Sequence, residues 1–86
     1  MKLIYCPECG DVRKLFREGT VCRCGHSWGE YLDPVNARIG GKAIPLGIGN
    51  SSLETAIKHR PLKGQGHEFL AFVIPEECAA VEVEND

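Results

Sequence analysis

Two short stretches decide the fold of this chain: CPECG at residues 6–10 and CRCG at residues 22–25. They hold two cysteine pairs, C-x2-C and C-x-C, with twelve residues between the pairs. Structural zinc sites take four tetrahedral ligands, and thiolate sulfur is a preferred one. Two close pairs joined by a hairpin can bring four sulfurs together, so the spacing predicts one metal ion. The predicted ligands are Cys6, Cys9, Cys22 and Cys24.

Compartment and cysteine count both favour a metal over disulfides. The first 20 residues have no apolar run long enough for a secretory signal, so we expect a cytoplasmic protein with reduced thiols. No stretch approaches the length of a membrane span, which predicts no membrane association. Five cysteines leave one over in any disulfide scheme, and we expect this thiol, Cys78 beside two glutamates, to be inert. A chain of 86 residues can form only a small apolar core, and a bound metal ion would add to its stability.

Charge is distributed unevenly along the chain, although the formal net charge is only −2. Residues 34–74 carry five basic and two acidic side chains, whereas residues 75–86 carry five acidic side chains and no basic one. A general nucleic-acid binder usually has a stronger basic bias than this. The composition therefore disfavours general nucleic-acid binding but leaves room for a small anion site.

Short strands and one helix are expected around the cysteines. Gly40-Gly41 predicts a turn, and Pro45, which lacks an amide donor, predicts an edge strand or extended loop at residues 43–48. The apolar run at residues 68–74 predicts a strand buried on both faces, with the helix on one of them. The other expected strands lie at residues 2–5, 12–16, 20–22 and 27–32.

The helix is predicted over residues 51–60. Ser51 and Glu54 fit a capping box, in which each side chain bonds to the backbone amide of the other residue. Leu53, Ala56 and Ile57 follow at helical spacing and form one apolar face. A helix this short should depend on packing rather than on its intrinsic propensity.

The cysteine pattern over residues 5–32 resembles that of the zinc-ribbon superfamily with its rubredoxin-like knuckles. CPECG matches the knuckle closely, whereas CRCG has one residue rather than two between its cysteines. With YLD at 31–33, PLGI at 45–48 and FVIPE at 72–76, the whole chain is similar to small uncharacterised zinc-ribbon proteins of bacteria and their phages. This resemblance implies no particular activity.

Two alternatives remain open at the metal site. His26 lies two residues after Cys24 and could replace one sulfur ligand. Four thiolates also bind iron, which would make the chain a rubredoxin-like electron carrier. Because a closed four-thiolate site has no open position for a substrate, we expect one structural zinc ion that stabilises the fold and does no chemistry.

A second candidate site is the glycine-rich segment GIGNSS at residues 47–52, directly before the predicted helix. A helix N-terminus presents free amides and a partial positive charge, which can hold a phosphate. The segment lacks the lysine of a complete phosphate-binding loop, so a plain capped turn is the competing interpretation. The candidate anion ligands are Gly47, Gly49, Asn50, Ser51 and Ser52.

The sequence predicts a small α+β fold in which hairpins with two knuckles pack on a short helix plus one or two strands. We expect a zinc ribbon at residues 1–33, a strand-helix-strand segment at 34–75 in the same cooperative unit, and an acidic tail at 76–86 that frays at its end. No nucleophile with a positioned base is visible, so we expect no enzyme. The predicted function is a non-enzymatic interaction module whose zinc supports a surface for a protein or nucleic-acid partner. The alternative is a binder of a nucleotide or another phosphate-bearing ligand at the glycine-rich segment.

Overall fold

The computed structural model describes residues 1–84, which form a small α+β fold as the sequence predicts. Over these residues there are eight strands and one helix. The elements are β1 (Lys2–Tyr5), β2 (Val12–Lys14), β3 (Thr20–Val21), β4 (Ser27–Tyr31), β5 (Ala37–Gly41), β6 (Ile44–Ile48), α1 (Asn50–Lys58), β7 (Ala71–Val73) and β8 (Val81–Glu84).

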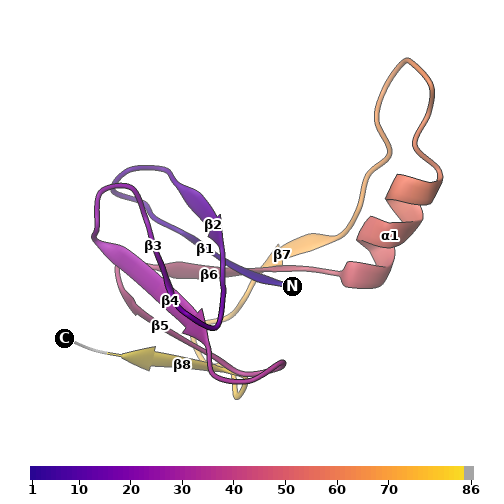
Figure 1. The fold of residues 1–86 in the computed structure, drawn as a ribbon. Helices are drawn as coiled ribbons and strands as arrows, with labels where there is room; N and C mark the ends of the chain where they lie inside the picture. Colours follow the sequence, from indigo (N-terminus) through magenta and orange to yellow (C-terminus); the bar gives the residue numbers. More distant parts are fainter. Residues whose placement is uncertain (85–86) are drawn as a thin grey trace.

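The strands form two four-stranded sheets. The first has the order β2-β1-β6-β7, with every neighbouring pair antiparallel. The second has the order β3-β4-β5-β8, in which β8 runs parallel to β5. Figure 1 shows the sheets together, with α1 and the loop after it projecting away from them. Each sheet contains strands from residues 1–33 and strands from later in the chain. The division into a ribbon at 1–33, a segment at 34–75 and a tail at 76–86 stays a prediction.

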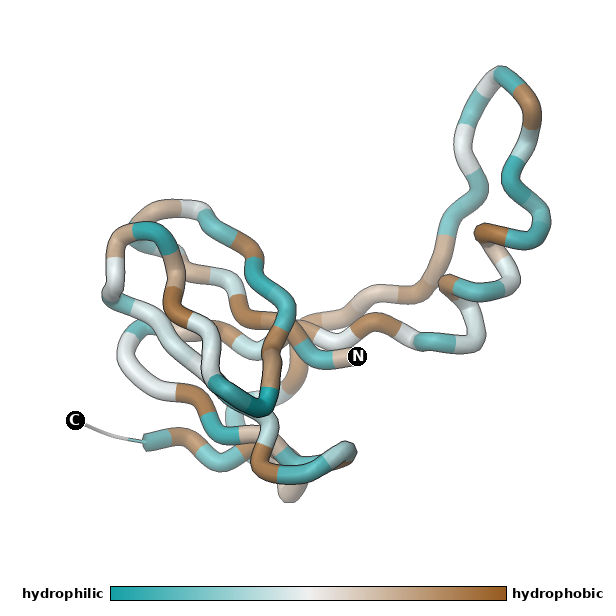
Figure 2. The backbone as a smooth tube through the Cα atoms, in the orientation of Figure 1, coloured by the Kyte–Doolittle hydropathy of each residue, from teal (hydrophilic) through white to brown (hydrophobic). Residues whose placement is uncertain are grey.

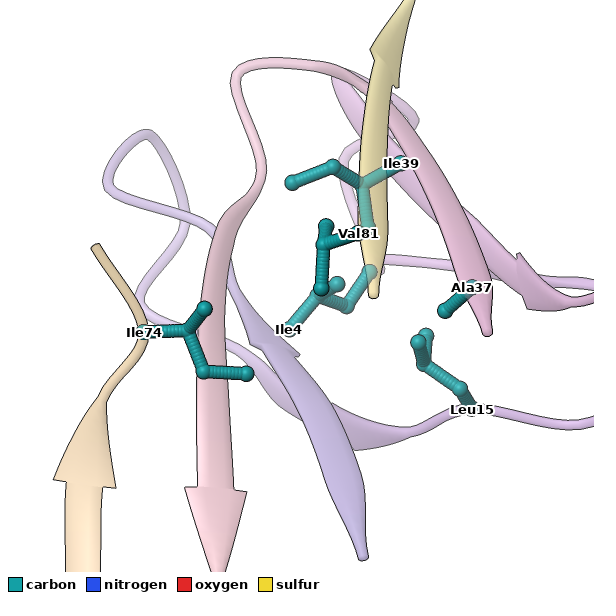
Figure 3. Packing of buried hydrophobic residues seen from close by; sticks show 6 residues of the cluster. All are labelled: Ile4, Leu15, Ala37, Ile39, Ile74 and Val81. Atoms are coloured by element: carbon teal, nitrogen blue, oxygen red, sulfur yellow. The ribbon is translucent and has the colours of Figure 1, made fainter. Parts of the chain in front are cut away.

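A small apolar core lies between the sheets. Its members come from both sheets, so their packing holds the sheets to each other (Figure 3). The cluster contains few side chains, in keeping with the limited burial open to a chain this short. The buried members are Ile4, Leu15, Ala37, Ile39, Ile74 and Val81.

The turn predicted at Gly40-Gly41 is present at the end of β5, where the Ala43 N–H donates to the Gly40 carbonyl at 3.4 Å, although both glycines also belong to that strand. The ring of Trp28, on the paired strand β4, lies over Gly40 where a Cβ atom would otherwise sit. The close approach of this ring requires a glycine at position 40. Gly41 has a φ of +67° and supplies the turn that leads the chain out of the strand.

The edge position predicted for residues 43–48 is also wrong. Strand β6 lies inside the first sheet, between β1 and β7. Pro45 is tolerated there because it lies at the end of the short pairing with β7, where its carbonyl still accepts the Ile74 N–H at 2.9 Å. An interior strand can carry a proline when its neighbour ends beside it.

The helix is confirmed, but the capping box is wrong. Helix α1 begins at Asn50 after the N-cap residue Gly49, and no side chain caps it. The hydroxyl of Ser52 donates to the Gly49 carbonyl at 2.8 Å and accepts the Leu70 N–H at 2.9 Å. The Gly49 N–H in turn donates to the Leu70 carbonyl at 2.9 Å. The chain that returns at Leu70 therefore fixes the first turn of the helix.

The prediction of a buried strand at residues 68–74 is wrong in the length and in the burial of the strand. Only Ala71–Val73 form a strand, β7, which is an edge strand with all three residues exposed. Helix α1 does not cover it, because the helix points away from both sheets (Figure 1). We call residues 49–70, which form this projection, the arm, and residues 1–48 with 71–84 the body. Figure 2 shows the apolar stretch along β6 and β7 that leads into the mostly polar arm.

The acidic C-terminal segment is only partly a tail. Val81–Glu84 form β8 and pair with β5, whereas the end of the segment, residues 85–86, for which fraying is predicted, lies outside the described residues. Val81 is buried in the core. Glu84 lies 3.8 Å from Arg38, which also contacts Glu30 at 2.7 Å, so part of the acidic charge is balanced by the neighbouring strand.

Candidate metal centre

The structure brings the four predicted cysteines together at one end of the two sheets. Cys6 directly follows β1, and Cys22 directly follows β3. Cys9 lies in the turn before β2, and Cys24 lies in the turn before β4. The four Sγ atoms all lie within 4.8 Å of one another. A bond network around them would therefore connect the two sheets.

The sulfur positions fit a tetrahedral metal site. A tetrahedron of sulfurs bonded to zinc at about 2.3 Å has edges of about 3.8 Å. The Cys24 Sγ lies 3.7 Å from the Cys6 Sγ and 3.6 Å from the Cys22 Sγ. All five cysteines of the chain are free, so no disulfide competes for these sulfurs. The cluster therefore has the donor set and spacing of a closed metal site, with Cys6, Cys9, Cys22 and Cys24 as the residues that would hold the ion.

Each cysteine turn is closed in the same way by the glycine that follows its second cysteine. Gly10 has a φ of +73° and Gly25 a φ of +83°, a backbone region that residues with a side chain rarely adopt. The Gly10 N–H donates to the Cys6 carbonyl at 2.7 Å, and the Gly25 N–H donates to the Cys22 carbonyl at 3.1 Å. The trailing glycines of the two motifs thus form the turns that aim the sulfurs inward.

Two residues that sequence reasoning missed support the cluster. The Ser27 N–H donates to the Cys22 Sγ at 3.3 Å, and Ser27 is fully buried. The Asp11 carboxylate accepts the Arg23 N–H at 2.9 Å and the Arg13 Nε–H at 2.7 Å, which ties the first cysteine turn to the second. Outer hydrogen bonds of this kind orient metal ligands. Neither residue stands at a motif position, so the sequence offered no signal for them.

The thiols of the cluster differ in how readily they ionise. The Ser27 hydroxyl is the main influence that lowers the pKa of Cys6. Burial opposes ionisation of Cys22, but the Ser27 N–H and the neighbouring thiols outweigh it and lower the pKa of Cys22 to about 6. At Cys24 the His26 N–H favours the thiolate, yet burial and the neighbouring thiols prevail and raise the pKa to about 12. Several thiolates at one point repel each other, and a divalent cation would relieve that repulsion.

His26 lies beside the cluster without being needed to complete it. Its Nδ1 is 3.3 Å from the Cys24 Sγ, and the residue is exposed. Four sulfurs already form a full tetrahedral set, so the position of His26 is that of a neighbour to Cys24. Its replacement of a sulfur ligand stays an alternative that metal spectroscopy can decide.

The candidate anion residues lie at the junction of body and arm, where the chain's own groups occupy several of them. The Asn50 Oδ1 accepts a hydrogen bond from the Met1 amine at 3.0 Å. Gly49 and Ser52 bond to Leu70 as described above. Gly47 lies in β6 against the ring of Phe72. These contacts give the segment a structural role, and anion binding there stays a prediction.

The helix content and the comparisons with known proteins add no further assignment for this centre. Within residues 1–84, no helix is long and apolar enough to cross a membrane. No protein-family model, curated protein or solved structure matches the chain. The interpretation of the four-cysteine cluster therefore rests on its own geometry and chemistry.

Proposed function

We propose that the chain is a non-enzymatic interaction module in which one structural zinc ion holds the body together and an apolar face binds a protein partner. The spacing of the sulfurs supports zinc at the cluster. A four-thiolate site has no position left for a substrate, which favours a structural role over a catalytic one. Free thiolates of this kind persist in a reducing compartment, so we place the protein in the cytoplasm.

The observation that carries the partner-binding role is a set of large apolar side chains left uncovered where the arm joins the body. Phe72 is 49% exposed and Val73 is 65% exposed, although both lie in a strand. Together with Val12 and Phe69 they line a shallow, mainly apolar groove of about 380 Å³. We call this surface the apolar face. Contiguous exposed apolar surface on a small protein is typical of interaction sites.

The metal and the apolar face are connected through the first sheet. Strand β1 leads directly into Cys6, pairs with β6 along four residues, and β6 pairs with β7. Strand β7 is short and lies at the edge, so its position depends on the strands that the sulfur cluster holds. A zinc ion at the cluster would therefore stabilise the surface without touching a partner.

Photo-crosslinking in the host cell tests this function. A benzoylphenylalanine at position 72 would lie in the apolar face, whereas the same residue at position 21 would replace Val21, which is 56% exposed in the other sheet. We expect position 72 to give one dominant protein adduct that position 21 does not, and Cys9→Ser to abolish it. Adducts of equal yield and identity from both positions would contradict the proposal, as would a rubredoxin-like visible absorption of the purified protein.

A further inference from the structure

We infer that two copies of this chain form a reciprocal dimer in which the arm tip of each copy docks into a groove at the far end of the other. The inference rests on the proposed function, because it takes the arm as part of an interaction module and names a second copy of the chain as one partner. The groove it uses shares Val73 with the apolar face but no other lining residue, so substitutions at positions other than 73 test the two surfaces separately.

The arm tip, residues 58–67, combines an exposed apolar side chain with positive charge. Leu62 has 100% of its surface exposed, the largest value among the exposed large apolar residues. Lys58, Arg60 and Lys63 surround it in sequence, and the tip has no acidic residue. An apolar anchor flanked by cations would fit a groove with an apolar floor and an acidic rim.

The body has such a groove where the two sheets meet. It holds about 500 Å³, and its floor consists of the core residues Ile39, Ile74 and Val81. Half-exposed Ile44, Val73 and Val83 form part of its rim, together with Glu76. We call it the end groove. A volume of this size is in the range of pockets that hold several side chains or a small ligand.

The charge beside the end groove is opposite to that of the arm tip. Glu76 lines the groove and Glu77 follows it in sequence, whereas Glu82 and Glu84 alternate with the groove residues Val81 and Val83 and so face the other side of β8, where Glu84 lies 3.8 Å from Arg38. The tip carries three basic and no acidic side chains, as counted without its histidines. Complementary charge of this kind steers association and fixes the register of two surfaces. It favours a second copy of this chain over a partner of neutral or basic character.

Geometry prevents a chain from filling its own end groove. Ile44 and Ile48 are the two ends of β6, with the groove beside Ile44 and the arm directly after Ile48. The molecule is 47 Å long and 26 Å wide, and the arm tip points away from the sheets (Figure 1). Two elongated copies lying side by side in opposite directions would place each tip at the other's end groove. Such an exchange has two-fold symmetry and closes on itself, which is the commonest form of homo-oligomer.

Sedimentation velocity of the zinc-loaded full chain, over a range of concentrations, tests this inference. We expect a dimer whose dissociation constant rises about 10- to 100-fold with Leu62→Ser, the change typical of a central apolar anchor. Val83→Ser in the end groove should have the same effect. Val35→Ser is the matched control. Val35 is 62% exposed and belongs to neither the arm tip nor the end groove, so this substitution should leave the dissociation constant unchanged. Zinc content and melting of each variant confirm that it is folded.

Charge reversal gives a second, more specific measurement. Arg60→Glu with Lys63→Glu should weaken the dimer, and added Glu76→Lys with Glu77→Lys should restore it, because the attraction returns with its sign exchanged. Raised salt should weaken the original dimer. A monomer at every concentration, or a dimer that Leu62→Ser leaves unchanged, would overturn the inference. A specific adduct at position 72 with a different protein in that case would leave the proposed function standing.

Discussion

Similar apolar side chains are buried in the body but exposed in the arm. Ile4 in the body is 1% exposed and packs between the sheets, whereas Ile57 on the helix of the arm is 62% exposed. The body has a core and a sulfur cluster, while Ala56 is the one buried residue of α1. The arm is fixed mainly by hydrogen bonds at Gly49 and Leu70. The difference shows that stability is concentrated in the body, which leaves the arm's apolar side chains available for contacts with other molecules.

Loss of one metal ligand should have the largest effect on this contrast. Cys9→Ser leaves three sulfurs, and structural zinc supplies about 10–16 kcal/mol in small metal-dependent folds. This is comparable to the whole stability of a typical domain, about 5–15 kcal/mol. We therefore expect the body to lose its cooperative thermal transition, measured by circular dichroism. Glu54→Gln on the exposed side of the helix, outside the arm tip, is the control and should melt as the original chain does. Unchanged melting of Cys9→Ser would disprove a structural role for the metal.

Truncation of the two isoleucines compares the regions directly. Ile4→Ala should lower the free energy of unfolding by about 2–5 kcal/mol, because it opens a cavity in the core. Ile57→Ala should change it by less than about 0.5 kcal/mol, since the side chain is largely exposed. Urea unfolding of the zinc-loaded variants measures both values. Equal losses would mean that the arm packs on the body in solution.

Two glycines sharpen the same contrast at the level of the backbone. Gly40→Ala should destabilise the body by about 1–3 kcal/mol, because the new Cβ would overlap the Trp28 ring. Gly66→Ala in the arm meets no atom within 4 Å and should be neutral or slightly stabilising. Thermal melting of the two variants provides the measurement. A neutral Gly40→Ala would contradict this, because it would mean that the Trp28 ring can move off position 40 without loss of stability.

The smallest expected effect is the pH dependence of the metal, which should act on the body alone. In the metal-free cluster the pKa of Cys24 is about 12 and that of Cys22 about 6. Zinc binds thiolates, so near neutral pH it must displace the proton of Cys24 but not that of Cys22. The zinc affinity should therefore fall as the pH falls. Below the pKa of Cys22 that thiol is protonated too, so zinc binding there releases about one more proton and the affinity should fall more steeply with pH. Competition with a chromophoric chelator measures this slope, and hydrogen exchange in the arm should not follow it. A slope that stays constant would contradict the difference between the two thiols.

Local chemistry could be predicted from the sequence, whereas burial could not. The cysteine pairs and their trailing glycines act within a few residues, so their clustering follows from spacing alone. The run of consecutive apolar residues ending at Ile74 predicted a strand buried on both faces, but the helix expected on one face points elsewhere and the strand lies exposed at the sheet edge. The turn at Gly40-Gly41 follows from the glycine pair, but the sequence carries no signal that Gly40 also accommodates the Trp28 ring. Asp11 and Ser27 support the sulfurs through contacts that only the folded chain creates.

X-ray absorption of the purified protein at the zinc edge, combined with elemental analysis, tests the central claim most directly. The account predicts one zinc ion per chain with four sulfur neighbours at about 2.3 Å and no nitrogen neighbour. A folded protein that contains no metal, or a first shell in which nitrogen replaces sulfur, would contradict it.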